Sequence, residues 1–212
     1  MKIENTIVSG IDNALRVAGF PMAETTEKAA NVPVEKQMKV AKHLAYTNTG
    51  EAHDQFLTGI TVTFDVTGSI QWWQEAERYR FLYFISSQSK MHRAYKMGIN
   101  ECCNKYVDEE IMFVCRHYQR EYNKINEAFK AGDPRVTKED VEDAFYRMIY
   151  NIPSGFEYTA GMVTNYRQLK TIYNQRKNHR LQEWREFCKW IESLPESHLI
   201  TGNYSKNHKE VE

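Results

Sequence analysis

Apolar and polar positions alternate most clearly at residues 59–68, which read GITVTFDVTG. Glycines bound this stretch, and most of its residues are β-branched. A period of two is typical of a strand that has one face in the core. The sequence therefore predicts a strand here, and a shorter first strand at residues 2–9, KIENTIVS.

Elsewhere, apolar residues recur every three or four positions, which predicts helices. The strongest helix is expected at residues 108–131, where Gly132 and Pro134 would end it. Thr137 and Asp140 resemble a capping box that opens a helix to about residue 151. Shorter helical stretches are predicted at residues 11–19, 35–47, 50–57 and 69–84, and a loop is predicted at residues 20–34.

The segment from 162 to 194 contains neither proline nor glycine, and it predicts one long helix that Thr164 caps and Pro195 ends. On a helical wheel its aromatic and aliphatic residues form one broad stripe. Arg176 lies on an edge of that stripe, with His179 nearby, and Arg180 falls near its middle.

An arginine keeps its charge when it is buried, so Arg176 and Arg180 each require a negatively charged partner. That partner could be a carboxylate of the same chain or of a neighbouring subunit. The side chains could also extend past the aromatic residues into water. A bound phosphate is a third solution, because it suits the five donors of a guanidinium. Spacing alone does not choose among these.

Composition limits the classes of partner. Lys+Arg and Asp+Glu both number 28, which argues against broad nucleic-acid binding but allows a local basic pocket. The four cysteines form no CxxC motif, so we expect thiols in a reducing compartment and no metal site. No apolar stretch is long enough to cross a membrane. We expect a cytoplasmic protein.

The residues around Arg176 resemble the C-terminal signature of the flavin-dependent thymidylate synthases. That signature has Asn-x-Arg, a leucine two positions later, an arginine nine positions after the first, and a glutamine six positions further on. The matching residues, with unbroken spacing, are Asn165, Arg167, Leu169, Arg176 and Gln182. The residue pattern WW…SxSxMH…NY…QRKNH…EW…FCxWIxSLP also resembles thymidylate-synthase-like proteins of phages and gut bacteria.

A second stretch resembles the same family. His53 and Phe56 match its Gly-His-x-x-Pro-Phe-x-His segment, although the proline is absent. The family then has Arg-His-Arg, a serine-containing run and an Asn-Glu pair. Arg78-Tyr79-Arg80 and Ser89 partly match this motif, but the Asn-Glu pair is missing and no arginine stands two residues after Ser89. The serine run at 86–89 could equally be a turn that ends a helix.

The resemblance implies an α+β fold with a small β-sheet and several long helices. We place this domain at residues 1–195, followed by a polar and mobile tail at 196–212. It also implies a cytoplasmic homotetramer with active sites shared between subunits. The implied reaction transfers a one-carbon group to C5 of a uracil nucleotide such as dUMP, or of a related pyrimidine nucleotide.

The same resemblance implies the roles of the site residues and the cofactors. Arg176 would polarise the pyrimidine, and FAD would bind the enzyme, with NADPH and methylenetetrahydrofolate as co-substrates. Substrate binding is assigned to Arg78, Arg80, Ser89, Arg167 and Arg180. Cofactor binding is assigned to His53, Asn165, His179 and Gln182.

Two other interpretations stay open. The chain could be a catalytically lapsed relative that keeps the fold and binds a nucleotide or another protein in an oligomer. It could also be an unrelated helical scaffold, which would lack the strand at 59–67 and an inward-facing Arg176.

Overall fold

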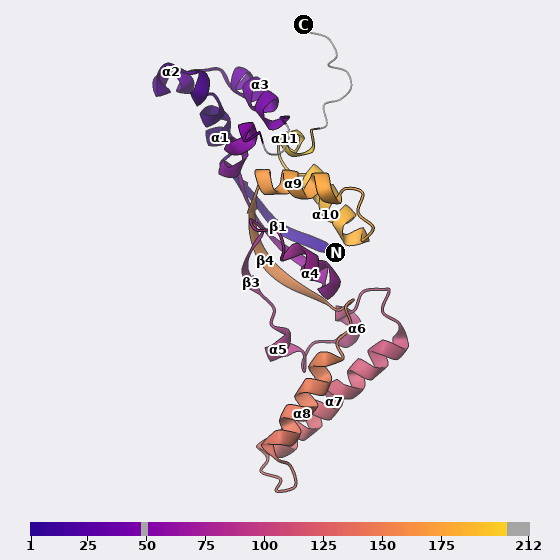
Figure 1. Cartoon of the computed structure of the whole chain (residues 1–212). Coiled ribbons are helices and arrows are strands. Elements are labelled where there is room, and N and C mark those ends of the chain that lie inside the picture. Colours follow the sequence, from indigo (N-terminus) through magenta and orange to yellow (C-terminus); the bar gives the residue numbers. More distant parts are fainter. Residues whose placement is uncertain (48–50, 203–212) are drawn as a thin grey trace. The chain divides into compact units, whose positions relative to one another are not determined.

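The computed structural model describes residues 1–47 and 51–202. The chain has an α+β fold with one antiparallel sheet of four strands in the order β1-β2-β4-β3 (Figure 1). The strands are β1 (Lys2–Ser9), β2 (Thr61–Ser69), β3 (Tyr83–Ser87) and β4 (Glu157–Asn165). The chain divides into two compact units, which we describe separately, and β2, β3 and β4 contribute residues to both.

The first unit contains residues 1–66, 76–85 and the described residues from 161 onward. Its helices are α1 (Ile11–Ala18), α2 (Thr26–Ala30), α3 (Val34–Ala45), α9 (Tyr166–Arg176), α10 (Gln182–Glu192) and α11 (His198–Thr201), with 3₁₀ turns η1 (Phe20–Met22) and η2 (His53–Gly59). Helix α10 packs its aromatic side chains on β2. The Phe64 ring centroid lies 4.5 Å from that of Trp190 and 6.0 Å from that of Phe187. Full burial of one such side chain stabilises the fold by about 2 kcal/mol.

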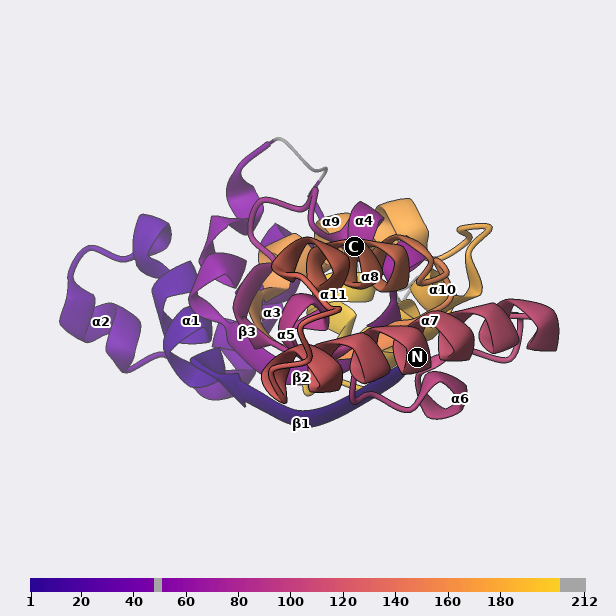
Figure 2. The same ribbon diagram turned by 90° about the horizontal axis from the view of Figure 1, so that it is seen from below.

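The second unit contains residues 67–75 and 86–160. Its helices are α4 (Ile70–Ala76, which ends in the first unit), α5 (Lys90–Arg93), α6 (Ile99–Cys102), α7 (Glu109–Lys130) and α8 (Lys138–Tyr150). Helices α7 and α8 pack side by side as a hairpin (Figures 1 and 2). A small core of Ile99, Cys115 and Phe156 lies where α6 and α7 meet the start of β4.

Several predicted elements are confirmed. The strands expected at 2–9 and 59–68 are β1 and β2, and the buried residues of β2 alternate along it. The capping box is also confirmed, because Thr137 accepts from the Asp140 backbone N–H while the Asp140 carboxylate accepts from the Thr137 N–H. The helices expected at 11–19, 35–47, 108–131 and 137–151 are α1, α3, α7 and α8.

The helix predicted at 69–84 is wrong in its second half. Helix α4 ends at Ala76, and the chain then turns and forms β3, which lies next to β4. The residues after the turn are mostly aromatic or β-branched, types that favour a strand once a neighbouring strand offers hydrogen bonds. The backbone N–H of Gln88 donates to the Thr159 carbonyl at 2.9 Å and so extends this pairing.

The single helix predicted from Thr164 to Leu194 is also wrong. Residues 157–165 form β4, the Asn165 side chain caps α9, and the chain leaves the helix between Arg176 and Gln182. The loop predicted at 20–34 likewise contains η1 and the short helix α2. Because α9 ends at Arg176, the placement of Arg180 in the middle of an apolar helical stripe is incorrect.

The tail expected at 196–212 lies partly outside the described residues, namely at 203–212. Residues 196–202 include α11, whose Leu199 and Ile200 are buried. The single domain over residues 1–195 stays a prediction.

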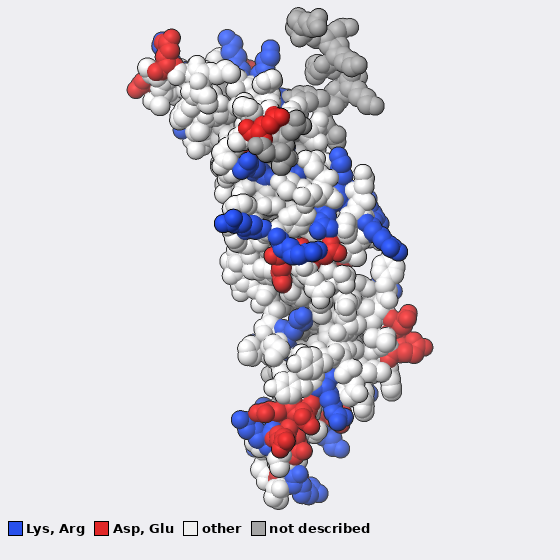
Figure 3. Space-filling model, in the orientation of Figure 1, with Lys and Arg blue, Asp and Glu red and all other residues white. Residues whose placement is uncertain are grey.

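The charge distribution agrees with the neutral composition. On the face shown in Figure 3, basic and acidic side chains both occur along the surface, and no area of one sign dominates it. Within residues 1–47 and 51–202, no helix combines the length and the apolar character needed to cross a membrane.

Candidate functional site

Arg176, the last residue of α9, lies in a group of aromatic side chains in the first unit. Its Nε donates to the Tyr79 hydroxyl at 2.7 Å, and its Nη1 lies 2.7 Å from His179 Nε2. The guanidinium carbon lies 4.7 Å from the Trp184 ring centroid and 5.5 Å from the Tyr79 ring centroid. The hydrogen bond and the stacking fix the plane of this cation.

The break between α9 and α10 keeps His179 beside Arg176. The Leu181 backbone nitrogen lies 3.2 Å from His179 Nδ1. Nη1 of Arg185 donates to the carbonyls of His179 and Arg180 at 2.6 and 2.8 Å. The Arg185 side chain satisfies carbonyl groups that would otherwise continue a helix, so the chain turns without proline or glycine.

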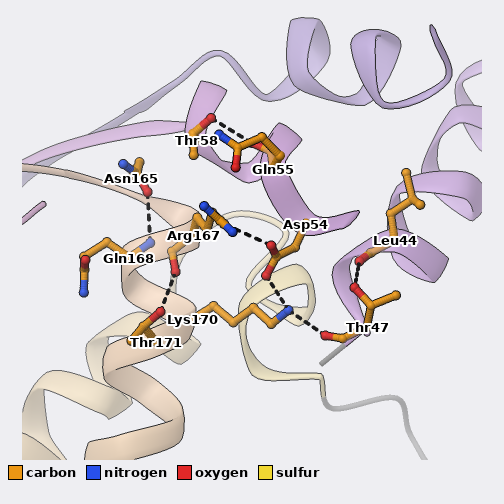
Figure 4. Close-up of polar contacts among 10 residues, drawn as sticks. All are labelled: Leu44, Thr47, Asp54, Gln55, Thr58, Asn165, Arg167, Gln168, Lys170 and Thr171. Carbon is orange, nitrogen blue, oxygen red and sulfur yellow. Dashed lines mark hydrogen bonds and ion pairs between the residues drawn. The ribbon is translucent and has the colours of Figure 1, made fainter. Parts of the chain in front are cut away.

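Asn165 sits where β4 becomes α9, and its role here is to start the helix. Its side-chain oxygen accepts from the Gln168 N–H at 2.9 Å (Figure 4). Asn is among the best residues for this position. The Asn165 contact therefore accounts for the start of α9, two residues before Arg167.

A buried ion network joins η2 to α9. Asp54 is 2% exposed, and its Oδ1 accepts from Arg167 Nε at 3.0 Å while its Oδ2 accepts from Lys170 Nζ at 2.8 Å (Figure 4). Lys170 also donates to the Thr47 carbonyl at 3.0 Å. Burial alone would raise the pKa of Asp54, but the hydrogen bonds and charges of Lys170 and Arg167 together lower it. Arg167 thus has a structural partner, and its side chain remains 34% exposed.

His53 begins η2 and lines a cavity of about 830 Å³ in the first unit. The lining is mostly apolar and contains no lysine or arginine. Its polar side chains come from Asn13, His43, Thr47, His53, Gln55 and Thr58. Such a volume and lining suit the ring system of a cofactor better than a charged group.

Ser89 belongs to the second unit and lines a separate cavity of about 500 Å³. The other lining residues are Ser87, Gln88, His92, Arg93, Lys96 and Met97, and none of them is acidic. From α7, Gln119 donates to the carbonyls of Ala94 and Met97, at 2.6 and 2.7 Å, and so holds the cationic segment. The side chains of Arg93 and Lys96 suit a small anion.

The remaining predicted binding residues are not gathered at Arg176. Arg78, Arg80, Arg180 and Gln182 are exposed. Arg80 lies over the Phe81 ring at 5.7 Å, and Gln182 Nε2 donates to Glu186 Oε1 at 2.6 Å. Arg78 and Arg80 belong to the first unit, whereas Ser89 belongs to the second.

Sequence reasoning did not assign roles to Tyr79, Trp184 or Lys96. Tyr79 carried a usable signal, because it occupies the histidine position of the Arg-His-Arg motif. Trp184 was interpreted only as part of an apolar stripe. Lys96 lies beyond the motif, and only the three-dimensional structure brings it to the Ser89 cavity.

The cysteines offer little nucleophilic chemistry. Burial and nearby negative charges raise the pKa of Cys103 to about 11 and that of Cys188 to about 12. A thiol with so high a pKa holds almost no thiolate at neutral pH. Across the described part of the chain, no three His, Cys, Asp or Glu residues are grouped to hold a metal ion.

Comparison with known proteins finds similarity of structure but no matching family model or curated sequence. The structure of the flavin-dependent thymidylate synthase ThyX from Helicobacter pylori, complexed with FAD and dUMP, matches with a TM-score of 0.65 at 13% identity. The match covers 95% of this chain and 97% of that chain.

Two further structures agree. Another ThyX structure from Helicobacter pylori, with FAD and dUMP, has a TM-score of 0.63 at 15% identity, over 95% of this chain and 97% of that chain. The UMP/dUMP methylase PolB from Streptomyces cacaoi, bound with 5-Br dUMP, has a TM-score of 0.54 at 13% identity, over 89% of each chain. This chain therefore has the fold of these proteins.

Proposed function

We propose that the protein is a flavin-dependent, thymidylate-synthase-like enzyme that transfers a one-carbon group to C5 of a uracil nucleotide such as dUMP. The observation that carries the proposal is the setting of Arg176. A guanidinium that bonds the Tyr79 hydroxyl through Nε and stacks on the Trp184 ring can donate to the carbonyl oxygens of a pyrimidine ring. Neighbours of the same fold are complexed with dUMP or its 5-bromo analogue.

Arg176 would act electrostatically. Donation to a ring carbonyl withdraws electron density and stabilises negative charge on that oxygen as C5 reacts. The Trp184 and Tyr79 rings beside the guanidinium exclude water and so strengthen this interaction. No thiol is required for this role, which agrees with the raised pKa of Cys103 and Cys188.

The cavity at His53 fits the ring system of FAD. It is apolar, and Asn13, His53 and Gln55 offer hydrogen bonds at its border. When bound, a reduced flavin supplies the hydride that the reaction requires. NADPH and methylenetetrahydrofolate are the co-substrates of this proposal.

We propose that the Ser89 cavity, which is lined by Arg93 and Lys96, binds a phosphate group. In the resembled family the active sites are shared between subunits, and we propose a homotetramer here. Large apolar side chains exposed on the α7–α8 hairpin support assembly. They are Ile111, Phe113, Val114, Phe129, Tyr146 and Tyr150. Light scattering coupled to gel filtration measures this state.

A lapsed relative that binds a nucleotide without catalysis is the second candidate. The missing Asn-Glu pair and the exposure of Arg78 and Arg80 favour it. Neither arginine shares a compact unit with Ser89.

Three measurements on the purified protein separate these candidates. Visible absorption after incubation with FAD and desalting reports flavin binding. Thermal shift with dUMP reports nucleotide binding. Release of tritium from dUMP labelled at C5, with all co-substrates present, reports the reaction. Nucleotide binding without flavin uptake and without tritium release would favour the lapsed relative. Absence of all three signals would contradict both candidates.

A further inference from the structure

Tyr79 has a specific relation to Arg176 that no binding or catalytic role yet covers. Its hydroxyl donates to Gln175 Oε1 at 2.9 Å, so its lone pairs face the Nε of Arg176, at 2.7 Å. We propose that Tyr79 is a positioning residue, which sets the plane of Arg176 before a ligand arrives, and that a ligand oxygen then replaces His179 at Arg176 Nη1. The proposal rests on the proposed nucleotide site at Arg176.

The backbone holds Tyr79 in place independently of Arg176. The Tyr79 N–H donates to the Ala76 carbonyl at 3.0 Å, and Leu82, three residues later, is buried. Thr164 on β4 donates its hydroxyl to the Phe81 carbonyl at 2.8 Å. The Tyr79 ring also meets the Trp184 ring edge-on, with centroids 5.6 Å apart. Tyr79 is therefore a fixed acceptor for a long and otherwise mobile side chain.

Fixing Arg176 in advance lowers the cost of binding. An arginine side chain loses rotamer entropy when a ligand orders it. With Nε already bonded to Tyr79 and the guanidinium stacked on Trp184, much of that ordering is complete in the folded protein. A phenylalanine at this position would keep the ring contact and remove only the hydroxyl.

His179 supplies the second half of the inference. Its Nδ1 faces the Leu181 N–H at 3.2 Å, and its Nε2 faces Arg176 Nη1 at 2.7 Å. A neutral imidazole accepts at one nitrogen only, so the two contacts cannot both be hydrogen bonds. In one tautomer Arg176 donates to Nε2; in the other, Leu181 donates to Nδ1, and Nε2–H stands beside the N–H of Arg176.

The second tautomer presents two donors to one place. A carbonyl or anionic oxygen of a ligand could accept a hydrogen bond from each of these two donors, on Arg176 and on His179. Ligand binding is thus coupled to the tautomer of His179. The free protein should hold the proton on Nδ1, and the complex should hold it on Nε2.

The test compares the wild-type chain with Tyr79→Phe, and with Tyr83→Phe as the matched control. Tyr83 follows on the same segment, is 51% exposed, and keeps its ring contact with Phe81 as phenylalanine. Calorimetry measures the affinity for dUMP. ¹⁵N spectra measure the rate at which the Arg176 Nε–H exchanges with solvent and identify the tautomer of His179. Melting temperatures check that each variant is folded. Tyr79→Phe should weaken dUMP binding about tenfold and speed Nε–H exchange severalfold. Tyr83→Phe should change neither.

The outcomes separate the two proposals. If the wild-type chain binds dUMP and Tyr79→Phe binds it equally well, the positioning role is overturned while the nucleotide site stands. If the wild-type chain does not bind dUMP, the nucleotide site fails, and unchanged Nε–H exchange in Tyr79→Phe would overturn the positioning role as well. A His179 tautomer that is identical with and without bound dUMP would overturn the replacement step.

Discussion

Lys170 Nζ lies 2.8 Å from Asp54 Oδ2, and this contact joins residues 116 positions apart in the chain. Arg167 Nε occupies the other carboxylate oxygen at 3.0 Å. Asp54 and Lys170 are both buried, and the charge of Lys170 depends on Asp54 for its compensation. The network fixes η2 against α9, the helix that carries Arg176.

Asp54→Asn is expected to destabilise the fold. It leaves the buried ammonium of Lys170 without its carboxylate, which costs about 3 kcal/mol and lowers the melting temperature by roughly 6–12 °C for a chain of this size. Glu24→Gln is the matched control, because its ion pair with Lys28 is exposed and its loss costs at most about 1 kcal/mol. Thermal unfolding measures both. Equal effects of the two variants would show that the buried network is not stabilising.

The same carboxylate predicts a dependence on pH. The pKa of Asp54 is lower in the folded protein than in the unfolded chain, so protons bind more readily to the unfolded state. This contribution to stability is complete above about pH 5 and is lost as pH falls through 4 and below. The difference in melting temperature between the wild-type chain and Asp54→Asn should therefore shrink between pH 7 and pH 3. A constant difference would contradict the lowered pKa.

Arg176→Lys is expected to weaken dUMP binding at least tenfold. Lysine has no planar fork and no Nε–H, so it cannot both bond Tyr79 and stack on Trp184 while donating to a ring carbonyl. Arg135→Lys, which alters an exposed ion pair with Asp133, is the control and should bind dUMP normally. Calorimetry with dUMP decides, and wild-type affinity in Arg176→Lys would remove the basis of the proposed function.

Ser89→Ala should reduce affinity for inorganic phosphate about fivefold. The reason is the proposed place of the phosphate in the cavity that Ser89, Arg93 and Lys96 line. Ser193→Ala, at the end of α10, serves as the control. Wild-type affinity for inorganic phosphate in Ser89→Ala would mean that Ser89 does not contact a phosphate.

Thr137→Ala should lower the stability of the fold by about 1 kcal/mol, because it removes the side chain that accepts from the Asp140 N–H at the start of α8. Denaturant titration measures the loss. Thr171→Ala is a suitable comparison, since its hydroxyl donates to the Arg167 carbonyl within α9 and caps no helix. A loss no larger than in that variant would argue against the capping box as a stabilising element.

Local patterns predicted the elements whose partners are close in the sequence. The alternation at 59–68, the periodicity of α7 and the capping residues of α8 are all local signals, and the structure confirms them. Strands β3 and β4 were missed for a common reason. They lie next to each other, so the preference of each for a strand depends on a segment about 70 residues away.

The candidate site was predicted in part. Motif spacing drew attention to Arg176, and the helical wheel placed His179 near it; the structure brings the two side chains together. The end of α9 could not be foreseen, because the Arg185 side chain bonds the carbonyls of His179 and Arg180 where the sequence has neither proline nor glycine to stop the helix. For the same reason, Arg180 was placed on a helical face that does not exist. Tyr79 needed the fold, since 97 residues separate it from Arg176.

The strand order β1-β2-β4-β3 has a consequence for synthesis on the ribosome. Within residues 1–47 and 51–202, strand β3 has β4 as its only neighbour, yet β4 is made after the whole α7–α8 hairpin. Until residues 157–165 emerge, the apolar residues of β3 have no neighbouring strand with which to pair. The hairpin, whose contacts are local, can already fold during that interval. Translation past β4 is therefore the moment at which the sheet can close.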